Sequence, residues 1–234
     1  MYFFTSTANE ERDPVNVLVA APHPDDDIIG CGGSMTRLSR AGHRVTIVYM
    51  TSGDAGGLTL EGEELARIRE DEAKQAAGIL GIDDLVFLRN PDGYLEPSRE
   101  NMLKLVQIIR HRKPDLAYLP HAREDHSDHK ATHDLCAEAI RRAGGPWFRE
   151  AGKEPWSVST TLCYEVWTPL SEISYVEDIT SSMPLKIEAI RSHRSQLAFI
   201  PYDDMTMSLN RFRGITTGRG RYCECFQVLY VSKV

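Results

Sequence analysis

The chain alternates between short apolar runs and longer segments with helical periodicity. Runs dominated by aliphatic and β-branched residues occupy residues 15–21, 44–51, 85–88 and 115–120. Their nearly continuous apolar character predicts strands that are buried on both faces, as in a parallel sheet covered by crossover helices.

Helical patterns follow three of these strands. "GGSMTRLSRAG" predicts a helix that begins near Gly32 or Gly33 and stops at Gly42, and residues 101–114 predict another that Pro114 ends. The clearest helix covers residues 63–81, where its apolar stripe consists of Leu65, Ile68, Ala76, Ile79 and Leu80. This alternation predicts a three-layer, Rossmann-like α/β fold with a mostly parallel sheet, whose ligands bind beyond the carboxyl ends of the strands.

The second half of the chain is less regular. Residues 161–167 and 224–232 predict further strands, and residues 181–197 predict a helix entered at Pro184. We find no internal repeat and no linker, and 234 residues are enough to bury one large core. We therefore expect a single domain over residues 1–234.

Composition narrows the class of protein. A net charge of -7 argues against a general nucleic-acid binder, because such binding rests on clustered Lys and Arg. The five cysteines are odd in number and lack CxxC spacing, which favours reduced thiols. The first 14 residues lack the positively charged start of a secretory signal, and no apolar stretch approaches the roughly 20 residues that span a bilayer. We expect a cytoplasmic protein without membrane insertion.

Two polar clusters follow predicted strands. "APHPDDDIIGCGG" spans residues 21–33, and "HAREDHSDHKATH" spans residues 121–133. Loops at the carboxyl ends of parallel strands can meet over one crevice. His23, one of Asp25 or Asp26, and a histidine of the second cluster would then form a common catalytic zinc set with an open position for water.

Simpler interpretations exist for each cluster alone. "HPDDD" is also typical of a turn with a helix-capping acid, and "HSDH" of a solvated loop. Similarly, His121 and His133 are expected to be capping or loop residues rather than ligands. Arg67 and Arg69 lie on a Glu-rich helix whose default role is a salt-bridged surface; of the two, Arg67 is the preferred substrate contact. The fact that both clusters directly follow strand ends nevertheless favours metal chemistry.

The two polar clusters together resemble the motifs of a known family. "PHPDDDIIGCGG", with "HSDH" at residues 126–129, resembles the zinc-dependent N-deacetylases called the LmbE-like or PIG-L family. Residues 66–82 and 186–196 resemble the family's Arg/Glu-rich helix and its C-terminal Lys-to-Ser-Gln segment. The family often has Glu or a small residue at Asp27, but it uses this position neither as ligand nor as base.

The resemblance implies a role for each residue of the motifs. It makes His23, Asp26 and His129 the ligands of one Zn²⁺ per chain, although other divalent metals would fit. Asp25 becomes the general base, His126 the residue that stabilises or protonates the tetrahedral intermediate, and Asp128 a support for an imidazole. The candidate substrate contacts are Arg67, Asp92 and His193.

Amide hydrolysis explains why such residues belong together. Zinc lowers the pKa of bound water to about 7 and polarises the carbonyl. The adjacent carboxylates can then divide the work, because one binds the metal while the other accepts and passes on a proton.

Four functions compete. The first is a zinc hydrolase removing the N-acetyl group from an N-acetylglucosamine (GlcNAc)-containing small molecule or glycoside, such as the thiol-cofactor precursor GlcNAc-malate. The second is an amidase of the same family acting on a larger acyl or thiol-conjugate amide. A non-catalytic sugar- or nucleotide-binding module is disfavoured because "GCGGS" is not GxGxxG. A protein with a decayed site is disfavoured because every expected position is filled. The predicted partners are amino-sugar substrates and further copies of the chain, as a trimer or hexamer.

Overall fold

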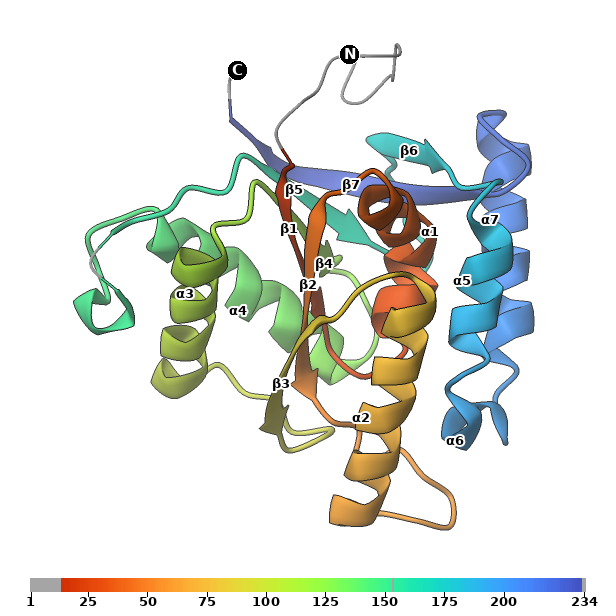
Figure 1. Ribbon diagram of the computed structural model, residues 1–234, viewed down its shortest axis with the longest axis horizontal. Coiled ribbons are helices and arrows are strands. Elements are labelled where there is room, and N and C mark those ends of the chain that lie inside the picture. Colours follow the sequence, from red (N-terminus) through yellow and green to blue (C-terminus); the bar gives the residue numbers. More distant parts are fainter. Residues whose placement is uncertain (1–13, 153, 233–234) are drawn as a thin grey trace.

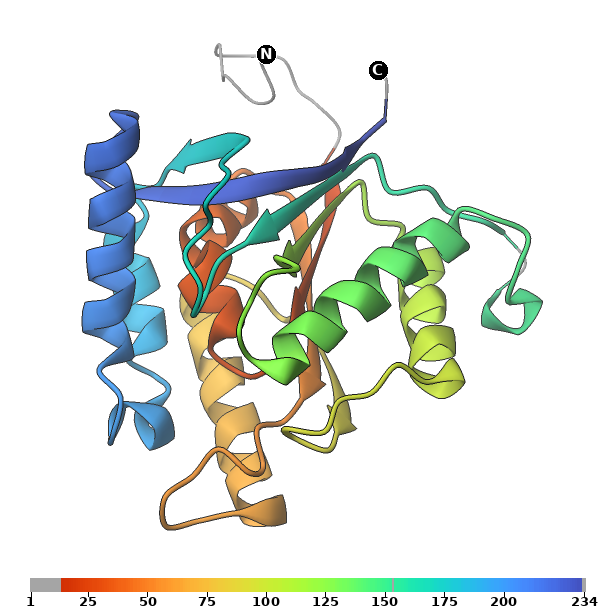
Figure 2. The same ribbon diagram turned by 180° about the vertical axis from the view of Figure 1, so that it is seen from behind.

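The computed structural model describes residues 14–152 and 154–232, so the sequence prediction about the N-terminal segment lies largely outside the described residues. Seven strands form one sheet in the order β3-β2-β1-β4-β5-β7-β6 (Figures 1 and 2). The first five in this order are parallel, whereas β7 runs antiparallel to β5 and β6. The strands are β1 (Asn16–Ala21), β2 (Arg44–Thr51), β3 (Asp84–Asn90), β4 (Leu116–Pro120), β5 (Thr160–Tyr164), β6 (Tyr175–Asp178) and β7 (Cys223–Val231).

Helices cover both faces of the sheet. Helices α3 and α4 pack on one face, and α1, α2 and α5 on the other with α7 outside α5 (Figure 1). The helices are α1 (Asp26–Arg40), α2 (Gly62–Ile79), α3 (Arg99–Arg112), α4 (Ser127–Ala143), η1 (Arg149–Ala151, a 3₁₀ turn), α5 (Met183–Ile190), α6 (Arg194–Leu197) and α7 (Tyr202–Thr217). Among the described residues, no helix combines the length and the apolar character needed to cross a membrane.

Strand β1 shows why the apolar runs were continuous. Val17 and Val19 pack in the core on the α1 side, while Leu18 and Ala20 pack in the core on the α3 side. Alternate residues of a strand face opposite sides of the sheet, so a strand between two helical layers needs apolar residues at every position. The prediction of an α/β fold with a mostly parallel sheet is confirmed. All five cysteines are buried and free.

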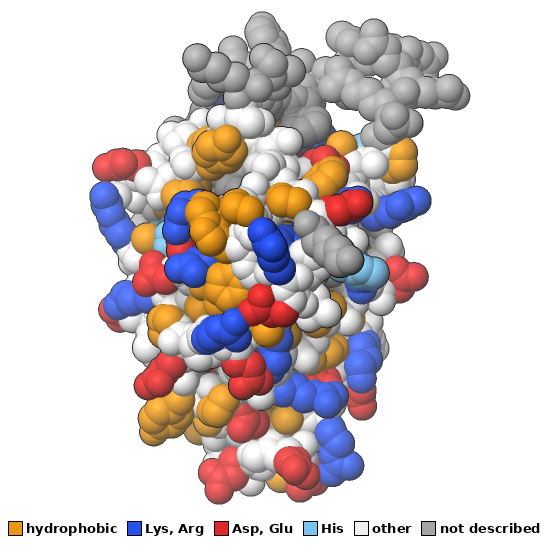
Figure 3. Space-filling view, turned by 90° about the vertical axis from the view of Figure 1, so that its left-hand side faces the viewer, with side chains coloured by type: hydrophobic (Ala, Val, Ile, Leu, Met, Phe, Trp, Pro, Cys, Tyr) orange, Lys and Arg blue, Asp and Glu red, His pale blue; other side chains and the backbone are white. Residues whose placement is uncertain are grey.

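The molecular surface does not separate charges by sign on the face seen from the α3 side. There, basic and acidic side chains alternate, with hydrophobic side chains between them (Figure 3).

Two helices differ from the sequence predictions. Helix α1 begins at Asp26, not near Gly32 or Gly33, and it contains a break at Cys31, where φ is -143° and ψ is 20°. The segment predicted as one helix over residues 181–197 forms the two short helices α5 and α6. The sequence also left β6 and α7 unassigned, and both lie toward the irregular end of the sheet.

A buried ion pair enters the break in α1. In an unbroken helix the Gly33 amide would donate to the Ile29 carbonyl. Here the Gly33 amide donates to Glu224 Oε1 at 2.7 Å, and the Ile29 carbonyl accepts from Lys186 Nζ at 2.8 Å. Lys186 Nζ and Glu224 Oε1 lie 2.6 Å apart, and Glu224 Oε2 also accepts from the Ser34 amide at 2.8 Å. The ion pair thus replaces one helical hydrogen bond, because it provides partners for both the Gly33 amide and the Ile29 carbonyl.

Glycines in α1 allow the helix to approach its neighbours closely. A Cβ atom on Gly30 would lie 2.2 Å from the ring of Tyr164, and one on Gly33 would lie 2.6 Å from Ile179. Tyr164 in turn donates its hydroxyl hydrogen bond to the Ala20 carbonyl of β1 at 2.8 Å. The first turn of α1 is therefore held against the end of β1, where the polar residues stand.

Candidate active site

The loops after β1 and β4 meet at the carboxyl edge of the sheet. Asp26 Oδ2 lies 2.9 Å from His23 Nδ1 and 3.2 Å from His129 Nε2. One carboxylate oxygen therefore stands between two imidazole nitrogens, one from the loop after β1 and one from the first turn of α4. The three side chains are buried, and each offers a ligand atom within 4.8 Å of the other two.

The buried polar atoms of this cluster fit a cation. Neither ring nitrogen of His129 makes a hydrogen bond of good geometry with any described residue, although the residue is fully buried. Burial raises the pKa of Asp26, but the nearby His129 and His23 lower it by a larger amount. The pKa of Asp26 therefore lies well below its usual value, and this carboxyl stays ionised. Two imidazoles and a carboxylate are the donors that zinc takes in many catalytic sites.

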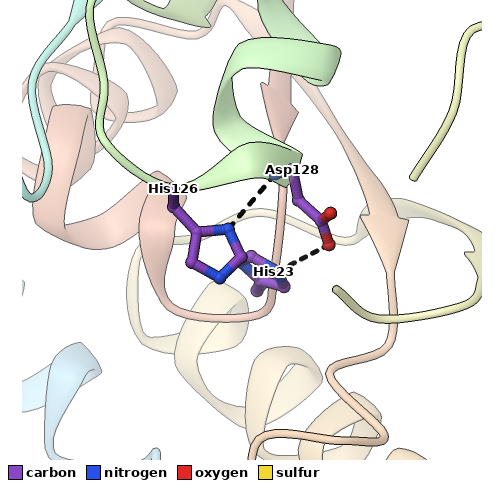
Figure 4. Close-up of side chains that lie close together, drawn as sticks. All are labelled: His23, His126 and Asp128. Carbon is purple, nitrogen blue, oxygen red and sulfur yellow. Dashed lines mark hydrogen bonds and ion pairs between the residues drawn. The ribbon is translucent and has the colours of Figure 1, made fainter. Parts of the chain in front are cut away.

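Asp128 orients His23. Its Oδ2 atom lies 3.2 Å from His23 Nε2 and accepts from the Gly93 amide at 2.8 Å, while its Oδ1 atom accepts from the Leu95 amide at 3.2 Å (Figure 4). Asp92 Oδ1 lies 3.0 Å from the same His23 nitrogen. These carboxylates occupy Nε2, which leaves Nδ1 of His23 to face Asp26.

Glu124 plays the corresponding part for His129, and the sequence analysis missed it. Its Oε2 atom lies 3.6 Å from His129 Nδ1, and its carboxylate accepts from the amides of Val166, Trp167 and Thr168. Burial raises the pKa of Glu124, but hydrogen bonds with His121, His129 and the Val166 amide bring it down to about 2. Its position two residues before "HSDH" was the available signal, but acids are common in loops.

Asp25 stands apart from His23 and His129. Its backbone has φ 119° and ψ -33°, a region that costs strain for any residue but glycine. Arg69 Nη2 lies 3.3 Å from Asp25 Oδ2 and donates to the Pro24 carbonyl at 2.8 Å. Burial raises the pKa of Asp25 more than Arg69 lowers it, and the result is about 7.

Arg69, and not the Arg67 that the sequence analysis preferred, reaches Asp25, whereas Arg67 as a substrate contact stays a prediction. Arg67 is exposed, whereas Arg69 is buried and reaches the site. Leu65 and Ala73 lie four residues on either side of Arg69, and both are buried. This spacing puts Arg69 on the buried stripe of α2 and was readable from the sequence.

His126 caps α4 at the open side of the site. Its Nδ1 atom accepts from the Asp128 amide at 3.2 Å, which assigns the ring proton to Nε2 (Figure 4). The ring centroid lies 5.0 Å from that of His23 and 5.2 Å from that of His129. Burial, and then the charges of those two histidines, lower the pKa of His126, so the ring is a neutral donor.

Three other histidines differ in their surroundings. His121 Nε2 lies 2.7 Å from the Thr168 carbonyl and so joins two loops, as expected of a loop residue. His133 lies within α4 rather than in a loop or cap, and its Nδ1 atom, 2.9 Å from the Pro120 carbonyl, joins α4 to the end of β4. His193 is fully buried at the start of α6, and neither of its ring nitrogens has a hydrogen-bond partner among the described residues. Burial lowers the pKa of His193 to about 3.

Comparison with known proteins identifies the family. Residues 18–140 match the model of the PIG-L family, described as GlcNAc-PI de-N-acetylase. The chain belongs to this family. It is 35% identical over 194 residues to a diacetylchitobiose deacetylase of Thermococcus kodakarensis, covering 79% of this chain and 71% of that protein. It is 28% identical over 192 residues to a probable N-acetyl-alpha-D-glucosaminyl L-malate deacetylase 2 of Bacillus anthracis, covering 78% and 82%.

A solved structure supports the same assignment. The N,N'-diacetylchitobiose deacetylase of Pyrococcus horikoshii, in complex with an inhibitor, matches with a TM-score of 0.83 and 34% identity. The match covers 93% of this chain and 84% of that chain. Fold and sequence therefore place the chain in the family that the two motifs suggested.

Proposed function

We propose that this protein is a zinc-dependent hydrolase that removes the N-acetyl group from a GlcNAc-containing small molecule or glycoside. The observation that carries the proposal is the position of Asp26 between His23 and His129, with Asp25 next to it in the chain but turned toward Arg69. Membership of the family and the deacetylase activity named for the relatives support it.

His23, Asp26 and His129 would hold the metal. When bound, the metal would polarise the amide carbonyl and make a water nucleophile available at neutral pH. Asp128 and Glu124 contact the opposite ring nitrogens of the two histidines and accept backbone amides as well, so they restrict how each ring can turn. Such outer contacts fix the tautomer and the direction of a ligand.

Asp25 would carry the proton. It is buried beside the ligands, and among the described residues its side chain pairs with Arg69 rather than with either ligand histidine. A free carboxylate there can accept a proton from the attacking water and deliver it to the departing amine nitrogen. Arg69 holds the strained turn in place through the carbonyls of Pro24 and Gly53.

His126 would face the carbonyl oxygen. Its Nδ1 atom is engaged with the Asp128 amide, so Nε2–H is the donor left for substrate. A fixed donor aimed at developing negative charge stabilises the transition state more than the ground state. Asp92 lies beside His23 and stays a prediction as a substrate contact, as does His193.

The decisive experiment compares wild type, Asp25→Asn and the control Asp125→Asn. Asp125 is an exposed carboxylate in the second cluster. We expect wild type and the control to hold about one zinc per chain and to release amine from GlcNAc substrates. Asp25→Asn should keep the metal and lose about 10²- to 10⁴-fold in turnover.

Two results would contradict the proposal at different levels. Near-normal turnover of Asp25→Asn would remove the assignment of the base. If the wild-type protein held no metal and released no amine, the assignment as a deacetylase would be wrong. A series of longer N-acyl substrates separates this function from the amidase of the same family. Cytoplasmic location and a homo-oligomeric state stay predictions from the sequence.

A further inference from the structure

An exposed aromatic side chain stands in the loop that is fastened to the His23 side of the site. Tyr94 is 79% exposed, and its neighbours Gly93 and Leu95 both donate their amides to Asp128, which contacts His23. The loop backbone is thus held against the site while the Tyr94 ring is left in solvent.

A second exposed aromatic side chain stands on the His129 side. Trp167 is 41% exposed, and its amide donates to Glu124 Oε2 at 3.2 Å, beside His129. The Trp167 ring also packs edge-on against Tyr202, with ring centroids 5.7 Å apart. Tyr202 is buried at the start of α7.

The two aromatic residues therefore share one arrangement. Each belongs to a loop whose amides bind a carboxylate, and each of these carboxylates contacts one of the two proposed histidine ligands. The carboxylates that orient the histidines thus also set the positions of Tyr94 and Trp167. An exposed aromatic pair fixed to the frame of a catalytic site is suited to contact the part of a substrate that extends beyond the reacting group.

We propose that Tyr94 and Trp167 form a subsite for a neutral, polyhydroxylated six-membered ring attached to the reacting GlcNAc. This proposal rests on the proposed function, since it concerns the aglycone of that substrate. A pyranose or cyclitol ring presents axial C–H groups on its faces, and these pack against the face of an aromatic ring, while its equatorial hydroxyls remain in water.

The charges beside the two aromatic residues favour a neutral aglycone over an anionic one. Glu96 is an exposed acid in the loop of Tyr94, and Glu172 is an exposed acid in the loop of Trp167. Arg123, in the loop between β4 and α4, lies 3.9 Å from Glu172, so these two charges offset each other. A dicarboxylate such as malate would meet an unfavourable or neutral field at this place.

The test measures kcat/KM for amine release with four substrates: GlcNAc, N,N'-diacetylchitobiose, GlcNAc-inositol and GlcNAc-malate. Wild type should prefer the two substrates with a neutral ring to GlcNAc-malate, and their ratio shows whether the ring is a pyranose or a cyclitol. Trp167→Ala and Tyr94→Ala should each reduce the ratio of neutral-ring substrate to GlcNAc by about 3- to 10-fold. Trp167→Phe and Tyr94→Phe should restore most of it.

The matched control is Trp147→Ala. Trp147 is 54% exposed in the segment between α4 and η1, and its replacement should leave the substrate ratios as they are in wild type. Equal losses on GlcNAc and on the neutral-ring substrates would show that the aromatic residues serve the reacting sugar or the fold, and would overturn the subsite. A wild-type preference for GlcNAc-malate would overturn it as well.

A binding measurement separates failure of the subsite from failure of the proposed function. Titration calorimetry with the Asp25→Asn variant and diacetylchitobiose reports binding without turnover. Should wild type release no amine, weaker binding after adding Trp167→Ala would uphold the subsite while the deacetylase assignment falls. Unchanged binding after that addition would overturn the subsite.

Discussion

Helix α1 touches two buried clusters of charge, and they are built differently. At its break, Lys186 and Glu224 form a balanced pair in which the ammonium has two acceptors and the carboxylate accepts from Gly33 and Ser34. At its start, Asp25 and Asp26 crowd together, and the ring nitrogens of the buried His129 make no proper hydrogen bond with the described residues.

This difference separates a structural cluster from a functional one. A buried charge is tolerated when its partners complete its hydrogen bonds, as in the pair at the break. Carboxylates and imidazoles left incomplete at the edge of a sheet instead call for a ligand, and a divalent cation supplies the missing charge. Replacing residues in the two clusters should therefore produce different kinds of loss.

The largest effect is expected for the cluster at the start of α1. His129→Ala removes one of the three proposed ligands, so metal affinity should fall by more than about 100-fold, beyond the loss typical of an outer contact. Metal content and amine release should disappear together while thermal unfolding remains cooperative. The exposed His111 provides the control His111→Ala. A His129→Ala protein that keeps its zinc would end the distinction between the clusters.

The balanced pair should instead affect stability. Lys186→Met leaves Glu224 buried without its cation, and the free energy of unfolding should fall by about 3–5 kcal/mol. Adding Glu224→Gln removes the stranded charge and keeps an acceptor for the Gly33 amide, so part of the loss should return. Urea unfolding measures both variants. If Lys186→Met were as stable as wild type, the ion pair would not stabilise the break in α1.

Glu124 combines features of both clusters, because its carboxylate accepts hydrogen bonds from loop amides and also lies near His129, a proposed metal ligand. The amides of Val166 and Trp167 donate to different oxygens of Glu124, so Glu124→Gln keeps an acceptor for only one of them, and it removes the charge near His129 Nδ1. We expect a 10- to 100-fold loss of metal affinity, about the range known for outer carboxylates, and a loss of about 1–3 kcal/mol in stability from the amide left without an acceptor. Competition with a chelator gives the affinity, and Glu96→Gln is the exposed control. Unchanged affinity would make Glu124 a loop residue only.

The smallest effect is expected for His193, whose contribution to stability depends on pH. Its pKa is about 3 in the fold against 6.5 for an ordinary histidine, because burial disfavours the charged ring. Between these values the unfolded chain binds more protons, so His193 makes the protein less stable as pH falls below about 6.5.

This contribution can be isolated by substitution. Between pH 6.5 and 5, the His193 effect amounts to about 2 kcal/mol. His193→Gln should flatten the dependence of the unfolding free energy on pH by this amount, which urea titrations at three pH values would reveal. Parallel pH profiles for variant and wild type would mean that His193 titrates normally.

Particular elements show how far sequence reasoning reached. The strands over residues 44–51 and 115–120 were recovered within one residue, because strands buried on both faces leave an unbroken apolar run. Helix α1 was placed several residues too late because its first turn is polar and its glycines suggested a loop. Its start depends on burial of Asp26 and on a break that Glu224 stabilises from the far end of the chain.

The sequence alone determined the alternation of strands and helices, the two motifs that end neighbouring strands, and thereby the family. These features depend on spacing along the chain, which a reader of the sequence can see. Only the tertiary structure decided that Arg69 rather than Arg67 reaches Asp25, that Glu124 stands behind His129, and that the loops of Tyr94 and Trp167 are bound to Asp128 and Glu124. Those relations join residues from different helices and loops, and their distances follow from packing, which no local pattern records.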